Sequence, residues 1–247
     1  MLSSLPRFVR AQIRFLTFRS SPIGADDFGP FLRWALLLTW IAGLGRYWDH
    51  HDAAWWQYAG LGSVAYVFVL SLILWAVGLP MKPRAWRYRD VLLFVCMTSP
   101  PAILYAIPVE RFTEFDTASS INAYFLLVVA VWRVLLLLRH LAVTADLGKG
   151  ISTTVALLPL AGIVSLLAFL NLEHATFNLM ASPDADSRTT NDEAYGIVIM
   201  LTVISVYAFI PLLISYVAAV GVRRRHREEA LAAAEAGASG AYGRRGE

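Results

Sequence analysis

Residues 123–141 read AYFLLVVAVWRVLLLLRHL, an apolar run broken only by Arg133 before it ends at Arg139 and His140. At a rise of 1.5 Å per residue, about 20 apolar residues cross a hydrocarbon core of about 30 Å. A backbone within lipid has to satisfy its own hydrogen bonds, which a helix does and an isolated strand does not. The stretch is therefore predicted to be a transmembrane helix.

Five further apolar runs flank this stretch on both sides. The chain has 247 residues, of which 57% are hydrophobic and 16% are charged, whereas about a quarter of a soluble domain is charged. We therefore predict an all-α fold, a polytopic transmembrane helix bundle with about six spans. The predicted spans are 31–48, 57–79, 91–108, 121–138, 151–172 and 195–222.

The distribution of basic residues predicts the orientation of these spans. Segments 1–30, 80–90, 139–150 and 223–247 together hold sixteen Lys and Arg, and the segments assigned to the other side hold three. The positive-inside rule then places both termini in the cytoplasm. We expect the membrane to be a bacterial inner membrane. We expect a cytoplasmic segment 1–30, a bundle over 31–222 and a basic tail over 223–247, disordered in its Gly/Ala-rich part from 237 onward. Because the basic residues are distributed among these loops, we expect no binding of nucleic acid.

The first residues have the pattern of an amphipathic helix. At 100° per residue, one face carries Leu5, Phe8, Val9, Ile13 and Leu16, and the opposite face carries Arg7, Arg10 and Arg14. This pattern favours an interfacial helix whose three arginines bind anionic lipid headgroups. The alternative is a helix packed on the cytoplasmic face of the bundle itself.

The predicted third span, VLLFVCMTSPPAILYAIP at 91–108, contains two adjacent prolines. Pro100 and Pro101 lack backbone N–H groups and should bend or interrupt a helix at this point. Such breaks shape binding cavities in some transporters. More often they serve only packing, and neighbouring side chains satisfy the freed backbone groups.

Arg133 is the most informative single residue, because an arginine inside a span is costly and is a functional candidate by default. The alternative is that its long side chain reaches the cytoplasmic interface. If Arg133 is buried, Asp90 at the start of the third span is the expected partner. Arg133 and Asp90 are therefore our candidate intramembrane binding residues.

Other chemistry-bearing motifs are weak or absent. In WDHHDAAWW at 48–56, His50 and His51 are weak metal-ligand candidates, because neighbouring residues seldom face one centre. We therefore expect no metal and no cofactor. We find no nucleophile–base pair, no HExxH motif and no phosphate-binding loop, and so assign no catalytic residues. The single cysteine, Cys96, excludes an intramolecular disulfide.

From Asp90 to about Ile163 the chain resembles bacterial members of the Yip1-like family of small multi-pass membrane proteins. The resembling features are LLFVCMTSPPAILYAIP with its mid-helix proline, the tryptophan-bearing FLLVVAVWRVLLLL, and the Ser/Thr-started DLGKGISTTVALLPLAGIV. The amphipathic N-terminal segment also fits. The resemblance implies a non-enzymatic membrane protein that acts through partners, and it transfers no site residues.

The leading functional hypothesis is a non-catalytic scaffold or accessory subunit of a larger inner-membrane complex. Its expected partners are membrane lipids and other integral membrane proteins, with a homo-oligomer as an open alternative. A rival hypothesis is a six-span permease subunit that works with a separate ATPase. A third is an intramembrane enzyme acting on lipid. The only residues that support it are Arg133, Glu173 and His174.

Overall fold

The computed structural model describes residues 2–19, 25–47, 54–83, 86–170 and 192–243, and every regular element within these ranges is a helix. The α-helices are α1 Leu5–Leu16, α2 Ala25–Tyr47, α3 Trp55–Tyr58, α4 Leu61–Gly78, α5 Tyr88–Met97, α6 Phe115–Arg139, α7 Lys149–Phe169 and α9 Asp192–Gly243. Short 3₁₀ helices cover Leu2–Ser4, Leu79–Met81, Pro100–Ala106 and Val109–Arg111, and a π-helical turn covers His140–Thr144.

Five of the described helices are long and apolar enough to cross a membrane. Their candidate spans are Asp27–Gly45, Leu61–Met81, Ser120–Thr144, Lys149–Phe169 and Ile199–Glu229. The predicted all-α fold is confirmed for the described residues, and the five apolar helices are compatible with a membrane protein. They correspond to five of the six predicted spans.

The remaining predicted span, 91–108, is not one continuous helix. Helix α5 ends at Met97, and after Thr98 and Ser99 the chain continues as the 3₁₀ helix Pro100–Ala106. The interruption expected from the two prolines is therefore present. Whether this segment crosses the membrane stays a prediction.

The broken segment runs beside α2 over most of that helix. The Arg89 guanidinium lies 5.0 Å from the centre of the Phe28 ring, and the Thr39 hydroxyl donates a hydrogen bond to the Cys96 carbonyl at 3.5 Å. Further along, a Cβ added to Gly45 would lie 2.8 Å from the Cβ of Ala106. These contacts follow in the same order on both segments, so the two run parallel and cover a similar length.

Helix α5 is the central element of the bundle. All its residues from Val91 to Met97 are buried; α2 and α4 pack along it, and the centre of the Phe94 ring lies 5.7 Å from that of Phe15 in α1. Because these residues are buried, they contact protein rather than lipid. Any backbone group left unpaired there has to find a partner within the protein.

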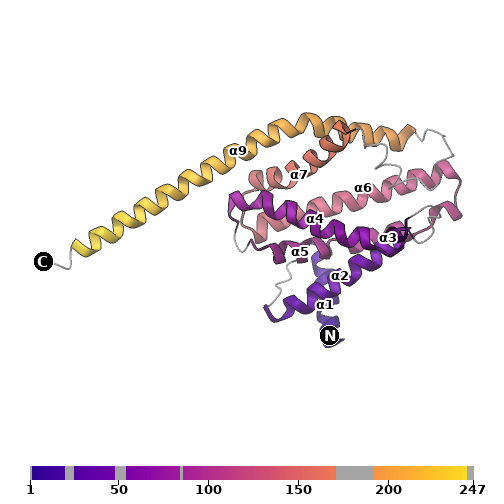
Figure 1. Cartoon of the computed structure of the whole chain (residues 1–247), viewed down its shortest axis with the longest axis horizontal. Coiled ribbons are helices and arrows are strands. Elements are labelled where there is room, and N and C mark those ends of the chain that lie inside the picture. The colour runs from indigo at the N-terminus through magenta and orange to yellow at the C-terminus, as the bar shows by residue number, and fades with distance from the viewer. Residues whose placement is uncertain (1, 20–24, 48–53, 84–85, 171–191, 244–247) are drawn as a thin grey trace.

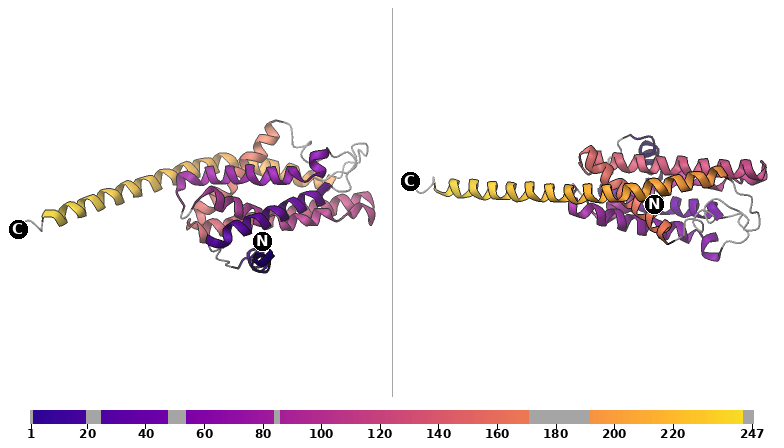
Figure 2. Two further views of the ribbon diagram at one scale, coloured as in Figure 1. Left: turned by 60° about the horizontal axis from the view of Figure 1, so that its bottom comes forward. Right: turned by 90° about the horizontal axis from the view of Figure 1, so that it is seen from above.

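Helices α7 and α9 pack against each other at one side of the bundle (Figure 1). Helix α9 is also attached to the end of α4: the Tyr216 hydroxyl donates to the Val77 carbonyl at 2.7 Å, and Arg223 Nη1 donates to the Met81 carbonyl at 2.7 Å. Beyond this point α9 projects away from the other helices, as both panels of Figure 2 show.

Three element boundaries differ from the sequence predictions. Helix α9 continues to Gly243, so the part of the tail expected to be disordered is helical up to that residue, in a stretch rich in the strong helix former alanine. Helix α2 begins at Ala25, within the predicted N-terminal segment 1–30. The predicted span 57–79 is split at Gly60, whose φ of +67° ends α3 and leaves α4 to begin at Leu61.

A close approach of α2 and α4 generates the first prediction. A Cβ added to Gly43 would lie 2.8 Å from the Ser63 Cβ and 2.9 Å from the Gly60 carbonyl oxygen, whereas one added to Gly221 in α9 would meet nothing within 4 Å. We expect Gly43→Ala to lower the melting temperature in detergent, because the clash outweighs the gain of about 1 kcal/mol in helix propensity. Gly221→Ala is the matched control, and it should leave the melting temperature unchanged or raise it. Equal effects of the two substitutions would contradict this packing.

Candidate functional site at the broken helix

The two prolines leave backbone carbonyls of α5 without their usual partners. In a continuous helix the N–H groups of residues 100 and 101 would bond to the carbonyls of Cys96 and Met97, and proline has no such group. The next N–H, that of Ala102, donates instead to the Ser99 carbonyl at 2.9 Å and so leaves the Thr98 carbonyl free. The break therefore removes the usual i+4 donors of three consecutive carbonyls within the buried core.

Side chains from three other helices bond to these three carbonyls. The Cys96 carbonyl accepts a hydrogen bond from the Ser99 N–H at 3.0 Å. The Thr39 hydroxyl of α2 donates mainly to the Ala35 carbonyl, at 2.9 Å, and makes a longer contact of 3.5 Å to the Cys96 carbonyl. Gln12 Nε2 of α1 donates to the Met97 carbonyl at 2.7 Å. Arg133 Nε of α6 donates to the Thr98 carbonyl at 3.0 Å.

We call these three side chains, Thr39, Gln12 and Arg133, the carbonyl cap. An unsatisfied buried carbonyl costs about 1–3 kcal/mol, so Gln12 and Arg133 stabilise the break by removing that cost. Thr39 adds only a long contact, because the Cys96 carbonyl is already bonded to the Ser99 N–H. Arg133 adds a positive charge at the C-terminal end of α5, where the helix dipole is negative. The cap joins α1, α2 and α6 to α5 at one point.

Only one of the two predicted intramembrane binding residues, Arg133, belongs to the cap. Arg133 pairs with a backbone carbonyl of α5 and makes no ion pair with Asp90. Asp90 lies near the N-terminal end of α5, about 12 Å along the axis from Thr98, and its carboxylate is 3.8 Å from Arg89 Nε. The structure does not bring the two candidate binding residues together.

Sequence reasoning missed Gln12 and Thr39. Both are buried, with exposed fractions of 6% and 1%, but a single polar residue in an amphipathic or apolar helix carries no sequence signal of its own. The available signal was indirect: two prolines in a span demand two or three donors from elsewhere. Gln12 Oε1 has no hydrogen-bond partner in the described structure, so this amide is only half satisfied.

The apolar face that the sequence predicts for α1 is partly buried against the bundle and partly exposed. Phe8 is buried against Phe31, with ring centres 5.5 Å apart and nearly perpendicular, while Val9 and Ile13 are exposed. Trp132 Nε1 of α6 donates to the Leu16 carbonyl at 3.1 Å. One side of α1 thus packs on the bundle, as the alternative interpretation required, and its placement at a lipid interface stays a prediction.

The three candidate lipid-binding arginines differ in their surroundings. Arg7 Nη1 is 2.8 Å from the Asp27 carboxylate. Arg10 and Arg14 are exposed and form no ion pair within the described part of the chain.

The weak metal candidates His50 and His51, and the residues Glu173 and His174, lie outside the described residues. Among the residues that are described, no three His, Cys, Asp or Glu side chains gather into a group that could hold a metal ion.

Comparison of the chain with protein-family models, with curated proteins and with solved structures found no match. The Yip1-like resemblance therefore rests on the sequence features alone.

The carbonyl cap generates the second prediction. Gln12→Leu removes the donor to the Met97 carbonyl, and we expect it to lower the free energy of unfolding by about 1 kcal/mol, because loss of the unpartnered Gln12 Oε1 offsets part of the cost. In a Pro100→Ala/Pro101→Ala background the new N–H groups can bond to the freed carbonyls. Gln12→Leu should therefore lower the free energy of unfolding by less in this background. Unfolding followed by circular dichroism in detergent measures the four variants as a double-mutant cycle. A Gln12→Leu cost that is the same in both backgrounds would refute the proline-to-cap link.

Proposed function

We propose that the chain is a six-span protein of a bacterial inner membrane, with both termini in the cytoplasm. In this proposal it acts as a non-catalytic scaffold or accessory subunit of a larger membrane complex. Partner proteins dock along the outer side of the helix pair α7 and α9. Two features support the proposal: the course of the broken segment beside α2, and an exposed tyrosine in the middle of α9.

The course of the broken segment supports the sixth span. From Phe28 to Gly45, α2 covers about 26 Å at 1.5 Å per residue, close to the thickness of a hydrocarbon core. The segment from Arg89 to Ala106 accompanies it over this length. If α2 crosses the membrane, the segment beside it reaches from one interface to the other as well.

Thiol labelling tests this span directly, because residues on its two sides should face opposite compartments. In a Cys96→Ala background, exposed Thr117 at the start of α6 and exposed Arg87 before α5 are each replaced by cysteine. We expect an impermeant maleimide to label the Thr117→Cys protein in spheroplasts and the Arg87→Cys protein only after the membrane is opened. Labelling of both variants from the same side would contradict a crossing between them.

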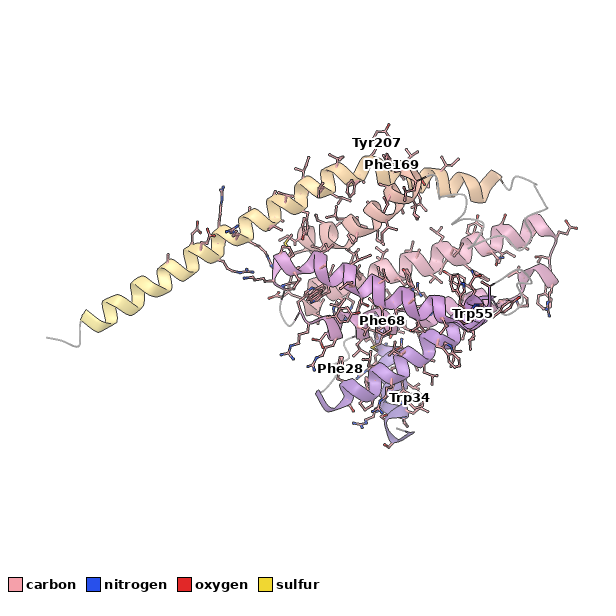
Figure 3. All side chains as sticks on the ribbon, in the orientation of Figure 1. Phe28, Trp34, Trp55, Phe68, Phe169 and Tyr207 are labelled. Atoms are coloured by element: carbon pink, nitrogen blue, oxygen red, sulfur yellow. The ribbon has the colours of Figure 1, made fainter. Side chains whose placement is uncertain are left out.

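The observation that carries the scaffold proposal is the position of Tyr207. It lies near the middle of the predicted span 195–222 with 79% of its side chain exposed. It points away from the bundle beside Phe169, which is 86% exposed (Figure 3). A phenol hydroxyl facing hydrocarbon has no water to bond, so an acceptor on an adjacent protein helix would stabilise it.

The apolar surface around Tyr207 extends this argument. Along α9 the exposed apolar side chains include Met200, Ile204, Ile210, Ile214 and Val217. They form a long face that the described part of the chain leaves uncovered. Lipid can cover such a face, but an exposed tyrosine hydroxyl at the middle of the span favours protein. The chemistry suits a transmembrane helix that offers one hydrogen-bond acceptor within an apolar surface.

Site-specific photocrosslinking provides the test. A photoreactive amino acid at Tyr207 should yield one discrete protein adduct in intact membranes, and the same probe at Tyr66, an exposed residue of α4, should not. With the probe at Phe169 instead, Tyr207→Phe should reduce the protein adduct several-fold, whereas Tyr124→Phe, at an exposed residue of α6, should not. Only lipid adducts at Tyr207 would overturn the scaffold proposal.

The carbonyl cap supports a scaffold over a permease subunit. In transporters with broken helices, freed carbonyls are used to bind an ion. Here the three freed carbonyls each accept a hydrogen bond from the protein itself, and the Arg133 guanidinium takes the place that a bound cation would require. No described contact at the break favours transport.

A further inference from the structure

Helix α1 lies across the bundle instead of along it. From its N-terminal to its C-terminal end it contacts three helices in turn: Phe8 meets Phe31 of α2, Gln12 bonds to the Met97 carbonyl of α5, and Leu16 bonds to Trp132 of α6. In the left panel of Figure 2, α1 is viewed nearly end-on while α2 and α6 run across the picture. A helix in this orientation is parallel to the plane of a membrane that the bundle crosses.

The contacts also indicate how deeply α1 lies. Met97 is six residues from Val91, and Trp132 is six residues from Leu138, which are the predicted cytoplasmic ends of their spans. Six residues correspond to about 9 Å along a helix. Interfacial helices place their apolar sides about 5–10 Å into the boundary between headgroups and acyl chains. The level of α1 therefore agrees with an interfacial position.

The side of α1 that faces away from the bundle carries a shallow, wide-open groove between its own side chains. The groove is lined by Leu5, Pro6, Val9, Arg10, Ile13 and Arg14. Val9 and Ile13, exposed by 45% and 57%, form its apolar side. Arg10 and Arg14 form its charged side, so the groove has one wall for hydrocarbon and one for an anion.

The charged side consists of two arginines and not three. Arg7 is neutralised by Asp27 at 2.8 Å and does not line the groove. Arg10 and Arg14 are one helical turn apart, so their Cβ atoms are about 5–6 Å from each other and both guanidinium groups can bond to one phosphate between them. Neither has a carboxylate partner in the described structure.

We propose that this groove binds a single anionic phospholipid of the cytoplasmic leaflet. The phosphate lies between Arg10 and Arg14, and the acyl chains pass across the stripe of Val9 and Ile13 into the hydrocarbon. The inference rests on the proposed membrane placement of the bundle, and it assigns the lipid contact to two of the three arginines. Charge complementarity selects an anionic lipid, and the apolar wall selects a lipid over free phosphate.

Native mass spectrometry of the whole protein, released from detergent micelles, counts bound lipids and tests the proposal. With phosphatidylglycerol added, we expect one lipid retained per chain, and at least tenfold weaker retention of phosphatidylcholine. Arg10→Gln/Arg14→Gln should reduce phosphatidylglycerol retention about tenfold. Arg7→Gln, the matched control on the same helix, should reduce it less than twofold. Val9→Ser/Ile13→Ser should weaken both lipids.

Three results would overturn the proposal: equal retention of the two lipids, an equal loss with Arg7→Gln, or displacement of the lipid by 50 mM inorganic phosphate. Melting temperatures of all variants confirm that each is folded, and resistance to alkaline extraction reports membrane insertion separately. If the wild-type protein is inserted but retains the two lipids equally, the proposed lipid site is wrong and the membrane placement still stands. Extraction of the wild-type protein by alkaline carbonate contradicts the proposed membrane placement itself.

Discussion

Two missing backbone hydrogen-bond donors determine the arrangement at the centre of this protein. Pro100 and Pro101 cannot donate, and the carbonyls that they leave without their usual partners lie at the end of α5, whose residues from Val91 to Met97 are buried. In such surroundings water is scarce and an unpaired carbonyl is costly. The chain satisfies these groups with side chains from α1, α2 and α6. The break is thus the point at which four helices are joined.

This arrangement explains the position of α1. An amphipathic helix without polar contacts to the bundle could slide along the interface, held only by apolar packing. Gln12 fixes α1 to the Met97 carbonyl, and the Leu16 carbonyl fixes its other end to Trp132. Trp34 Nε1 of α2 donates to the Ser4 hydroxyl at 3.3 Å. Directional bonds near both ends hold α1 across the bundle and determine which of its sides stays exposed.

The position of α1 in turn separates its residues into three groups. One group faces the bundle: Phe8, Gln12 and Phe15. A second group, Val9 and Ile13, faces outward, and the third group is the exposed arginines Arg10 and Arg14 next to it. The sequence pattern alone shows two faces, because periodicity registers polarity and cannot distinguish packing against protein from packing against lipid. The ion pair of Arg7 with Asp27 is equally invisible in the sequence, since it depends on how α1 and α2 cross.

Hydropathy was sufficient to predict the long apolar helices, because their length is imposed by the bilayer. The prolines were sufficient to predict the break, because the absence of their N–H groups is a local property. The partners of the freed carbonyls were not predictable, since Gln12 is separated from Met97 by 85 residues. For the case of a buried Arg133 the expected partner was a carboxylate, Asp90. The structure provides the Thr98 carbonyl instead, because a helix end displays acceptors that composition does not reveal.

The native thiol of Cys96 offers the most direct test of whether the break is sealed by the protein. Cys96 is fully buried, and its own carbonyl is one of the three capped oxygens. We expect a small water-soluble thiol reagent to leave Cys96 unmodified for hours in the folded wild-type protein. In Arg133→Leu the uncapped Thr98 carbonyl should draw in water and make Cys96 reactive. Rapid modification of Cys96 in the folded wild-type protein would show water at the break and contradict a sealed, structural role for it.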